Sequence, residues 1–388
     1  MSKPPWRRAF DTVERGVGRP LEHIVQTGVF ADTLSTTVNI QGQLRREVER
    51  SVLRTRNGLK YMAGIGRPEL GTTPKSTVWS SGKAELWHYL SDGVTYGTPI
   101  VIVPSLISRS YIVDLLPKSS FVGALLRAGF DVYMVDWGVA DAADANNTLE
   151  TYIDDLLPEA IEATIAKSRA EGVTVLGYCM GGALALLLTA GHPELPIRNV
   201  VSLATPADYT KMGVLGRLVA EGGIDPDAVI DKTGNVPPEV LARAFKLLRP
   251  TETVVNYVNL LDNIWNDEFV ESYQAMGHWV NDHVPFPGAA FRQAIQVARE
   301  NALLRGQVTL GGREVRLGDI RVPYLNVMGA NDHIVPPDAA SPLTDLVGGE
   351  AEELRAPGGH VGCVVGRSAM RNTIPAIVDW AAARSERS

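Results

Sequence analysis

The amino-acid sequence predicts an α/β fold, in which a mostly parallel β-sheet carries helices on both of its faces. From about residue 76 onward, short continuous apolar runs alternate with helical patterns, and such runs are typical of strands buried on both faces. The alternation stops at about residue 209 and returns after about residue 312, which indicates an insertion. A glycine-flanked turn at residues 177–182 joins one buried run directly to a helix. Such alternation implies right-handed crossovers between parallel strands.

Residues 1–75 are predicted to form a helical lead-in to the main domain. Residues 41–59 are dense in Arg and Glu, and four apolar residues among them have helical spacing: Leu44, Val48, Val52 and Leu53. Two interpretations are open. The helix either packs on the surface of the main domain, which the composition favours, or serves as a docking helix for a partner or a hydrophobic surface.

The main domain is predicted to span residues 76–388. Its expected strands fall at residues 98–103, 131–135, 173–176, 200–204, 322–328 and near 352–355. Its expected helices fall at residues 121–128, 152–170, 180–190 and about 369–384. Between them, residues from about 209 to 312 have mostly helical patterns, are rich in Pro, Trp and Asn, and lack buried-strand runs. We interpret this stretch as a mainly helical cap insertion over the sheet.

Composition narrows the class of protein. Hydrophobic residues make up 45% of the chain and charged residues 21%, which is ordinary for a globular protein. The formal net charge of -7 argues against a nucleic-acid partner. The two cysteines, Cys179 and Cys363, are too few for a secreted disulfide framework. No signal-peptide core follows the basic N-terminus, and the longest apolar stretch, residues 183–190, is too short to span a bilayer. We therefore expect a cytoplasmic protein without a transmembrane segment.

The turn between the predicted strand at 173–176 and the next helix carries a cysteine in the pattern Gly177-x-Cys179-x-Gly181. This strand–turn–helix setting is that of a nucleophile elbow. The N-terminus of the following helix favours the thiolate form of Cys179. The backbone N–H of Met180 would supply one donor of an oxyanion hole. The alternative is a buried core cysteine in a glycine-rich turn.

A cysteine nucleophile needs a base and a group that orients the base. In α/β hydrolases the chain order is nucleophile, acid, histidine, and two loops late in the sequence fit that order. Asp332 directly follows the predicted strand at 322–328, and His360 follows the strand near 352–355 in a glycine-rich setting. We predict that His360 is the general base and that Asp332 orients it. The second oxyanion donor is expected in the loop after residues 98–103, at the backbone N–H of Ile107 or of its neighbour.

For three other polar residues, both a functional and a structural interpretation stay open. His278 and His283 lie in the predicted cap, where they either line the pocket or are structural. Asp136 ends a predicted strand, where it either shapes the pocket or closes a packed turn. We interpret Cys363 as a small buried residue and not as a second nucleophile.

These motifs together resemble the polyhydroxyalkanoate synthases, which look like lipases whose elbow serine has become cysteine. The resemblance covers residues from about 80 to 370. It rests on Gly177-Tyr178-Cys179-Met180-Gly181-Gly182, Asp136-Trp137-Gly138, Thr205-Pro206-Ala207-Asp208-Tyr209, Asp332-His333-Ile334-Val335-Pro336, Gly359-His360-Val361-Gly362 and the stretch Asp282-His283-Val284-Pro285-Phe286-Pro287-Gly288. It places the catalytic cysteine, acid and histidine of that family on Cys179, Asp332 and His360.

The resemblance implies an acyltransferase that polymerises (R)-3-hydroxyacyl-coenzyme A and releases coenzyme A through acyl-cysteine intermediates. Acyl-coenzyme A is then a substrate, and neither a cofactor nor a metal is expected. The implied partners are the growing polyester chain or granule surface and a helical partner subunit or a second copy in a homodimer. Two alternatives stay open: a thioesterase or esterase with the same cysteine nucleophile, and a non-enzymatic granule-associated relative. The sequence leaves the acyl chain length open.

Overall fold

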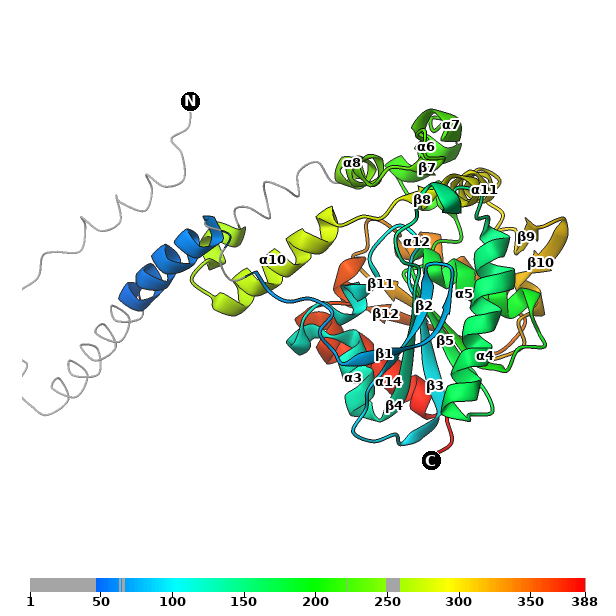
Figure 1. Ribbon diagram of the computed structural model, residues 1–388, viewed down its shortest axis with the longest axis horizontal. Coiled ribbons are helices and arrows are strands. Elements are labelled where there is room, and N and C mark those ends of the chain that lie inside the picture. The colour runs from blue at the N-terminus through cyan, green and yellow to red at the C-terminus, as the bar shows by residue number, and fades with distance from the viewer. Residues whose placement is uncertain (1–46, 63, 65–66, 221, 249–258, 388) are drawn as a thin grey trace, which may run out of the picture.

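The computed structural model describes residues 47–62, 64, 67–220, 222–248 and 259–387, and its centre is an eight-stranded sheet (Figure 1). The strand order is β1-β2-β4-β3-β5-β6-β11-β12. From β4 to β12 neighbouring strands pair in parallel, whereas β1, β2 and β4 pair antiparallel. The bounds are β1 Lys75–Ser81, β2 Ala84–Tyr89, β3 Tyr96–Val103, β4 Phe130–Asp136, β5 Val173–Tyr178, β6 Ile197–Leu203, β11 Tyr324–Gly329 and β12 Ala351–Ala356.

The predicted apolar runs coincide with the six parallel strands, within a few residues at each end. The hairpin of β1 and β2 has no counterpart among the predicted strands. Its first strand is half exposed, with the polar sequence Lys-Ser-Thr-Val-Trp-Ser-Ser. An edge strand of this kind shows no continuous apolar run, which explains why the pattern missed it.

Helices cover both faces of the sheet and bury a separate core on each (Figure 1). Among these helices are α3 Phe121–Ala128, α4 Leu157–Ser168, α5 Met180–Gly191 and α14 Ile374–Ala382. On one face, α4 and α5 bury the aliphatic side chains Leu157, Ile161, Leu184 and Leu187. On the other face, α3 and α14 bury the side chains Phe121, Leu125, Ile374 and Ile377. The sheet is therefore enclosed from both sides, and its strand ends are left to carry a site.

Two of the predicted helices begin with a wider turn. The predicted helix at 152–170 is a π-helical turn, η4 Thr151–Leu156, followed by α4. The predicted helix at 369–384 is likewise a π-helical turn, η8 Ala369–Thr373, followed by α14. Apolar periodicity cannot distinguish these turns from α-helix because both bury one face of the same segment.

The stretch between β6 and β11 is mostly helical, but its described residues also include four short strands. Its elements are η5 Tyr209–Lys211, α6 Val214–Ala220, α7 Pro226–Val229, β7 Asn235–Val236, α8 Pro238–Leu248, α10 Asp267–Asn281, β8 Phe286–Pro287, α11 Gly288–Arg299, β9 Gln307–Leu310, β10 Arg313–Arg316 and η6 Leu317–Asp319. The expected cap boundary at about residue 312 falls inside the β9–β10 hairpin, whose turn residues Gly311 and Gly312 both have positive φ. A Gly-Gly pair is a hairpin signal that the helical interpretation overlooked. The division into lead-in, main domain and cap stays a prediction.

The predicted lead-in lies partly outside the described residues, which include only 47–62, 64 and 67–75 of it. Residues 47–62 form a helix that lies beside α10 and projects from the body (Figure 1). Asn57 is buried in this contact, whereas Val48 and Val52 are 62% and 63% exposed. Of the predicted apolar residues that the structure describes, Leu53 is half-buried one helical turn before Asn57, whereas Val48 and Val52 face away from the contact. Leu44 lies outside the described residues.

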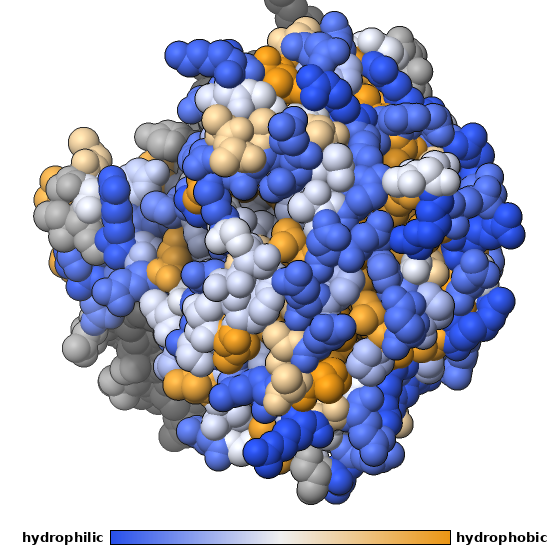
Figure 2. Space-filling view, turned by 45° about the vertical axis from the view of Figure 1, so that its right-hand side comes forward, coloured by the Kyte–Doolittle hydropathy of each residue, from blue (hydrophilic) through white to orange (hydrophobic). Residues whose placement is uncertain are grey.

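Polar residues cover most of the face seen in Figure 2, and hydrophobic residues appear there in small groups. Scattered apolar side chains of this kind are normal on a protein surface. Across the described residues, no helix combines the length and the apolar character needed to cross a membrane.

Candidate active site

Cys179 occupies a strained turn between β5 and α5. Its backbone has φ 56° and ψ -121°, a conformation that side chains other than glycine rarely adopt. Its N–H donates to the Leu203 carbonyl at 2.8 Å, and its own carbonyl accepts from Thr205 Oγ1 at 3.0 Å. A Cβ atom at Gly177 would overlap the backbone of Gly181, so the tight turn requires glycine there. The turn between β5 and α5 thus has the tight, strained geometry that the glycine pattern predicted, and the role of Cys179 as nucleophile stays a prediction.

His360 and Asp332 form a buried hydrogen-bonded pair. Nδ1 of His360 lies 2.7 Å from Oδ2 of Asp332, and the two residues are 8% and 3% exposed. The second carboxylate oxygen of Asp332 accepts the backbone N–H groups of Ile334 and Val335, each at 2.8 Å. Three hydrogen bonds therefore satisfy a carboxylate that would be costly to bury alone.

The imidazole of His360 also interacts with Cys179. Burial by itself would lower the pKa of His360, but the charge of Cys179 and the hydrogen bonds to Asp332 and Cys179 outweigh it and raise the pKa to about 10. Because Nδ1 is engaged by Asp332, the ring meets Cys179 through its other nitrogen. The arrangement favours the protonated, imidazolium form of His360.

Met180 and Ile107 are the residues predicted to supply the oxyanion donors, and this role stays a prediction. Met180 is the first residue of α5, where a backbone N–H has no acceptor within the helix. Ile107 lies in the wall of the same cavity as Cys179. Its N–H faces Ser105 Oγ at the long distance of 3.5 Å, and its carbonyl accepts from Nδ1 of His283 at 3.2 Å.

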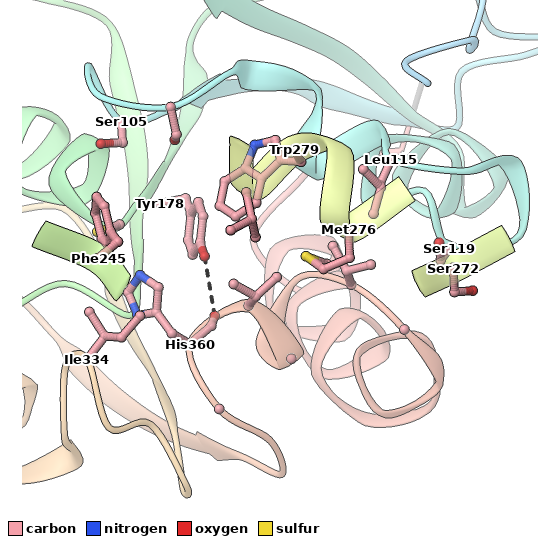
Figure 3. A pocket seen from close by; sticks show the side chains of 18 of the residues that line it. Ser105, Leu115, Ser119, Tyr178, Phe245, Ser272, Met276, Trp279, Ile334 and His360 are labelled. Atoms are coloured by element: carbon pink, nitrogen blue, oxygen red, sulfur yellow. Dashed lines mark hydrogen bonds between the residues drawn. The ribbon is translucent and has the colours of Figure 1, made fainter. Parts of the chain in front are cut away.

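A cavity of about 800 Å³ contains Cys179 and His360 in its wall. At one end, Phe245, Tyr178 and Ile334 surround His360, and at the other end lie Ser119 and Ser272 (Figure 3). The wall between the two ends is mostly apolar, and its larger side chains are Leu115, Leu116, Met276, Trp279, Val361 and Val365. The indole N–H of Trp279 donates to the Arg109 carbonyl at 3.0 Å, which ties α10 to the core beside the cavity.

The structure brings Cys179, Asp332 and His360 together and resolves some of the open interpretations. His283 lines the cavity, whereas the side chain of His278 is 57% exposed. Asp136 closes a turn, since its carboxylate accepts from Ser110 Oγ and from the Gly138 N–H.

Cys363 is fully buried, and burial together with the nearby charge of Asp332 raises its pKa to about 12. A thiol held in its protonated form in this way is a poor nucleophile.

Sequence reasoning missed several cavity residues, among them Phe245, Trp279 and Met276. They lie on α8 and α10, where a single apolar side chain in a helix gives no sign that it faces a cavity. Within the described ranges, no three His, Cys, Asp or Glu side chains group in a way that would hold a metal ion.

Comparisons with known proteins identify the fold and the family. Residues 98–366 match the family model of the alpha/beta hydrolase fold. The chain is 36% identical to the poly(3-hydroxyalkanoate) polymerase subunit PhaC of Haloferax mediterranei, over 83% of this chain and 66% of that protein. It is 35% identical to the PhaC subunit of Allochromatium vinosum, over 83% of this chain and 92% of that protein. It is 34% identical to the PhaC subunit of Thiocystis violacea, over 84% of this chain and 93% of that protein.

The family model covers well over half of the chain, and two of these relatives are matched over more than nine tenths of their own length. The chain therefore belongs to the poly(3-hydroxyalkanoate) polymerase family of the α/β hydrolase superfamily, a family of acyltransferases.

Proposed function

We propose that this chain polymerises (R)-3-hydroxyacyl groups from their coenzyme A thioesters through acyl intermediates on Cys179. The observation that carries the proposal is the hydrogen-bonded series Asp332–His360–Cys179 in the wall of a largely apolar cavity. Family membership supports the substrate class, because the relatives are named as poly(3-hydroxyalkanoate) polymerase subunits. Acyl-coenzyme A is the substrate in this scheme, and no step calls for a cofactor.

In the first step, the sulfur of Cys179 attacks the thioester carbonyl carbon and forms a new carbon–sulfur bond. The bond from that carbon to the coenzyme A sulfur breaks, and the departing sulfur takes the proton that His360 holds. The N–H groups of Met180 and Ile107 donate to the carbonyl oxygen as negative charge develops on it. One thioester replaces another, so the acyl group stays activated.

In the second step, the 3-hydroxyl of another hydroxyacyl unit attacks the carbonyl carbon on Cys179. His360 takes the hydroxyl proton as general base, an ester bond forms, and the carbon–sulfur bond to Cys179 breaks. Asp332 keeps the imidazole in the orientation that both steps need. The products are a lengthened ester chain and a free Cys179.

Water is the competing nucleophile in the second step. The polarity of the cavity decides whether water or a hydroxyl group attacks the acyl group on Cys179. Leu115, Met276 and Trp279 are among the apolar side chains that line it, and an apolar wall disfavours water. The rival thioesterase or esterase would use the same three residues but admit water. A non-enzymatic granule-associated relative would have no need for the hydrogen-bonded series.

The test is to incubate the purified full chain with (R)-3-hydroxybutyryl-coenzyme A and to follow thiol release together with the acyl product. Polymer formation is the expected result. Thiol release with free hydroxy acid as the sole product would replace the proposal with a thioesterase. No thiol release, even with a helical partner subunit added, would favour the non-enzymatic relative.

The position of the acyl group gives an internal control. Peptide mapping of the trapped intermediate should find the acyl group on Cys179 and not on Cys363, which is buried and held as a thiol. Parallel assays with longer hydroxyacyl thioesters would define the acyl chain length. The growing polyester or granule surface, a partner subunit or second copy, and a cytoplasmic or granule-associated location stay predictions.

A further inference from the structure

His283 is a second histidine in the wall of the cavity, and the steps proposed above leave it without a role. It follows α10, and its backbone forms an isolated antiparallel bridge with Ser108. Its ring stacks on Phe245, with centroids 5.3 Å apart and planes 7° apart. The side chain is thus fixed against the loop that carries Ile107.

The hydrogen bond to Ile107 determines the tautomer of His283. A carbonyl oxygen can only accept, so Nδ1 of His283 donates to the Ile107 carbonyl at 3.2 Å. In the neutral ring, Nε2 is then a hydrogen-bond acceptor. Nε2 is buried and has no hydrogen-bond partner among the described residues. Buried acceptors normally have a partner, so this atom calls for one that the protein does not supply.

We propose that Nε2 of His283 accepts a hydrogen bond from the 3-hydroxyl of the acyl group that Cys179 receives. His283 would thereby select 3-hydroxyacyl thioesters over unsubstituted ones. The inference rests on the function proposed above, because it assigns one contact to the same substrate. Phe245 stacks on a face of the imidazole, whereas a hydrogen bond to Nε2 lies in the plane of the ring, so the acyl group displaces no existing hydrogen bond there.

The position of His283 indicates which substrate atom meets it. Its other nitrogen holds the carbonyl of Ile107, whose N–H we assign to the thioester oxygen. A substrate group that donates a hydrogen bond to Nε2 must therefore lie close to the thioester carbonyl. In a 3-hydroxyacyl thioester the hydroxyl lies two carbon atoms from that carbonyl and is the sole donor of the acyl group, whereas the pantetheine amides lie beyond the sulfur.

The test compares (R)-3-hydroxybutyryl-coenzyme A with butyryl-coenzyme A, which lacks only the hydroxyl. With enzyme in excess, coenzyme A release reports the first acylation, and the ratio of kcat/KM for the two thioesters is the readout. The ratio is independent of the fraction of folded protein. His283→Asn keeps an N–H where Nδ1 lies but has no atom at Nε2, so we expect the ratio to fall about fivefold to tenfold.

Two further variants distinguish recognition from support of the loop. His283→Gln places an amide where Nε2 lies and loses the bond to Ile107, so both rates should fall while the ratio stays close to that of the wild type. His278→Asn is the matched control, since His278 is exposed and does not line the cavity. It should leave the ratio unchanged.

An unchanged ratio in His283→Asn would overturn the inference and leave His283 as a support of the loop or a contact to pantetheine. That result would not touch the proposed function, because the wild type would still be acylated. If the wild type is acylated by neither thioester, the proposed function fails and the inference fails with it.

Discussion

Nδ1 of His360 and Oδ2 of Asp332 lie 2.7 Å apart in the interior, although 28 residues separate them in the chain. The contact forms because β11 and β12 are parallel neighbours, so the loops that follow them emerge at the same edge of the sheet. Cys179 follows β5 at that edge as well. Parallel pairing thus converts three distant loops into one site.

The first prediction concerns the nucleophile and the base. Cys179→Ala and His360→Ala should each lower the rate of coenzyme A release by about a thousandfold or more, because members of such a series act as a unit. The measurement is thiol release from (R)-3-hydroxybutyryl-coenzyme A. Circular dichroism and thermal unfolding serve as folding controls. Near-normal turnover in either variant would contradict the assignment.

The second prediction concerns pH and Asp332. The pKa of His360 is raised in the folded chain, so the folded chain holds this proton more tightly than the unfolded chain does. Protonated His360 therefore stabilises the folded chain. This stabilisation is fully present below the ordinary histidine pKa of about 6.5 and is lost as pH rises through the raised value of about 10. Asp332→Asn removes the negative charge that helps to raise the pKa of His360, so the pKa of His360 in the folded chain falls.

The stability advantage of the wild type over Asp332→Asn should therefore be largest near about pH 6 and shrink towards about pH 10. Unfolding in denaturant at a series of pH values measures it. The alkaline limb of the acylation rate should also move to lower pH in the variant, since the departing thiol needs protonated His360. A pH-independent difference between the two proteins would refute the charge coupling.

The third prediction concerns the elbow. A Cβ atom at Gly177 would overlap the backbone of Gly181 and Gly182, which cannot move away cheaply. Gly177→Ala should therefore lower the free energy of unfolding by about 1–3 kcal/mol or more and abolish acylation. Gly277→Ala is the control, because it lies inside α10 with open space around its Cα. It should be neutral or stabilising by up to about 1 kcal/mol. Equal losses in both variants would rule out this account.

The fourth prediction concerns the contact between residues 47–62 and the segment before α10. Asn57 donates from a buried position to the Ile264 carbonyl at 2.8 Å, whereas Arg56 pairs with Asp267 at 2.7 Å in an exposed position. Asn57→Ala leaves a buried carbonyl without its donor and should cost about 1–3 kcal/mol of local stability. Arg56→Ala should cost about 1 kcal/mol or less.

Hydrogen exchange of the amides in residues 47–62 measures this local opening free energy. The decisive result is which of the two variants loses more local stability. A larger loss in Arg56→Ala than in Asn57→Ala would show that the exposed ion pair, and not the buried hydrogen bond, holds the helix.

The sequence by itself determined the six parallel strands of the sheet and the elements of the candidate site. Strands buried on both faces have continuous apolar runs, and the elbow needs glycine at fixed positions beside Cys179. Both features can therefore be predicted from the sequence alone. The order of Cys179, Asp332 and His360 along the chain indicated the series before any distance was known. Local patterns of this kind depend only on neighbouring residues.

Tertiary structure alone decided which side chains face the cavity and which face of the lead-in helix packs. Phe245, Trp279 and His283 line the cavity because separate segments of the insertion fold over it, and no local pattern encodes that arrangement. Asn57 is buried because it lies against Ile264, which is 207 residues away in the chain, while Val52 lies outside that contact and is exposed. Contacts between distant segments depend on the whole packed chain, which is why the sequence alone left them open.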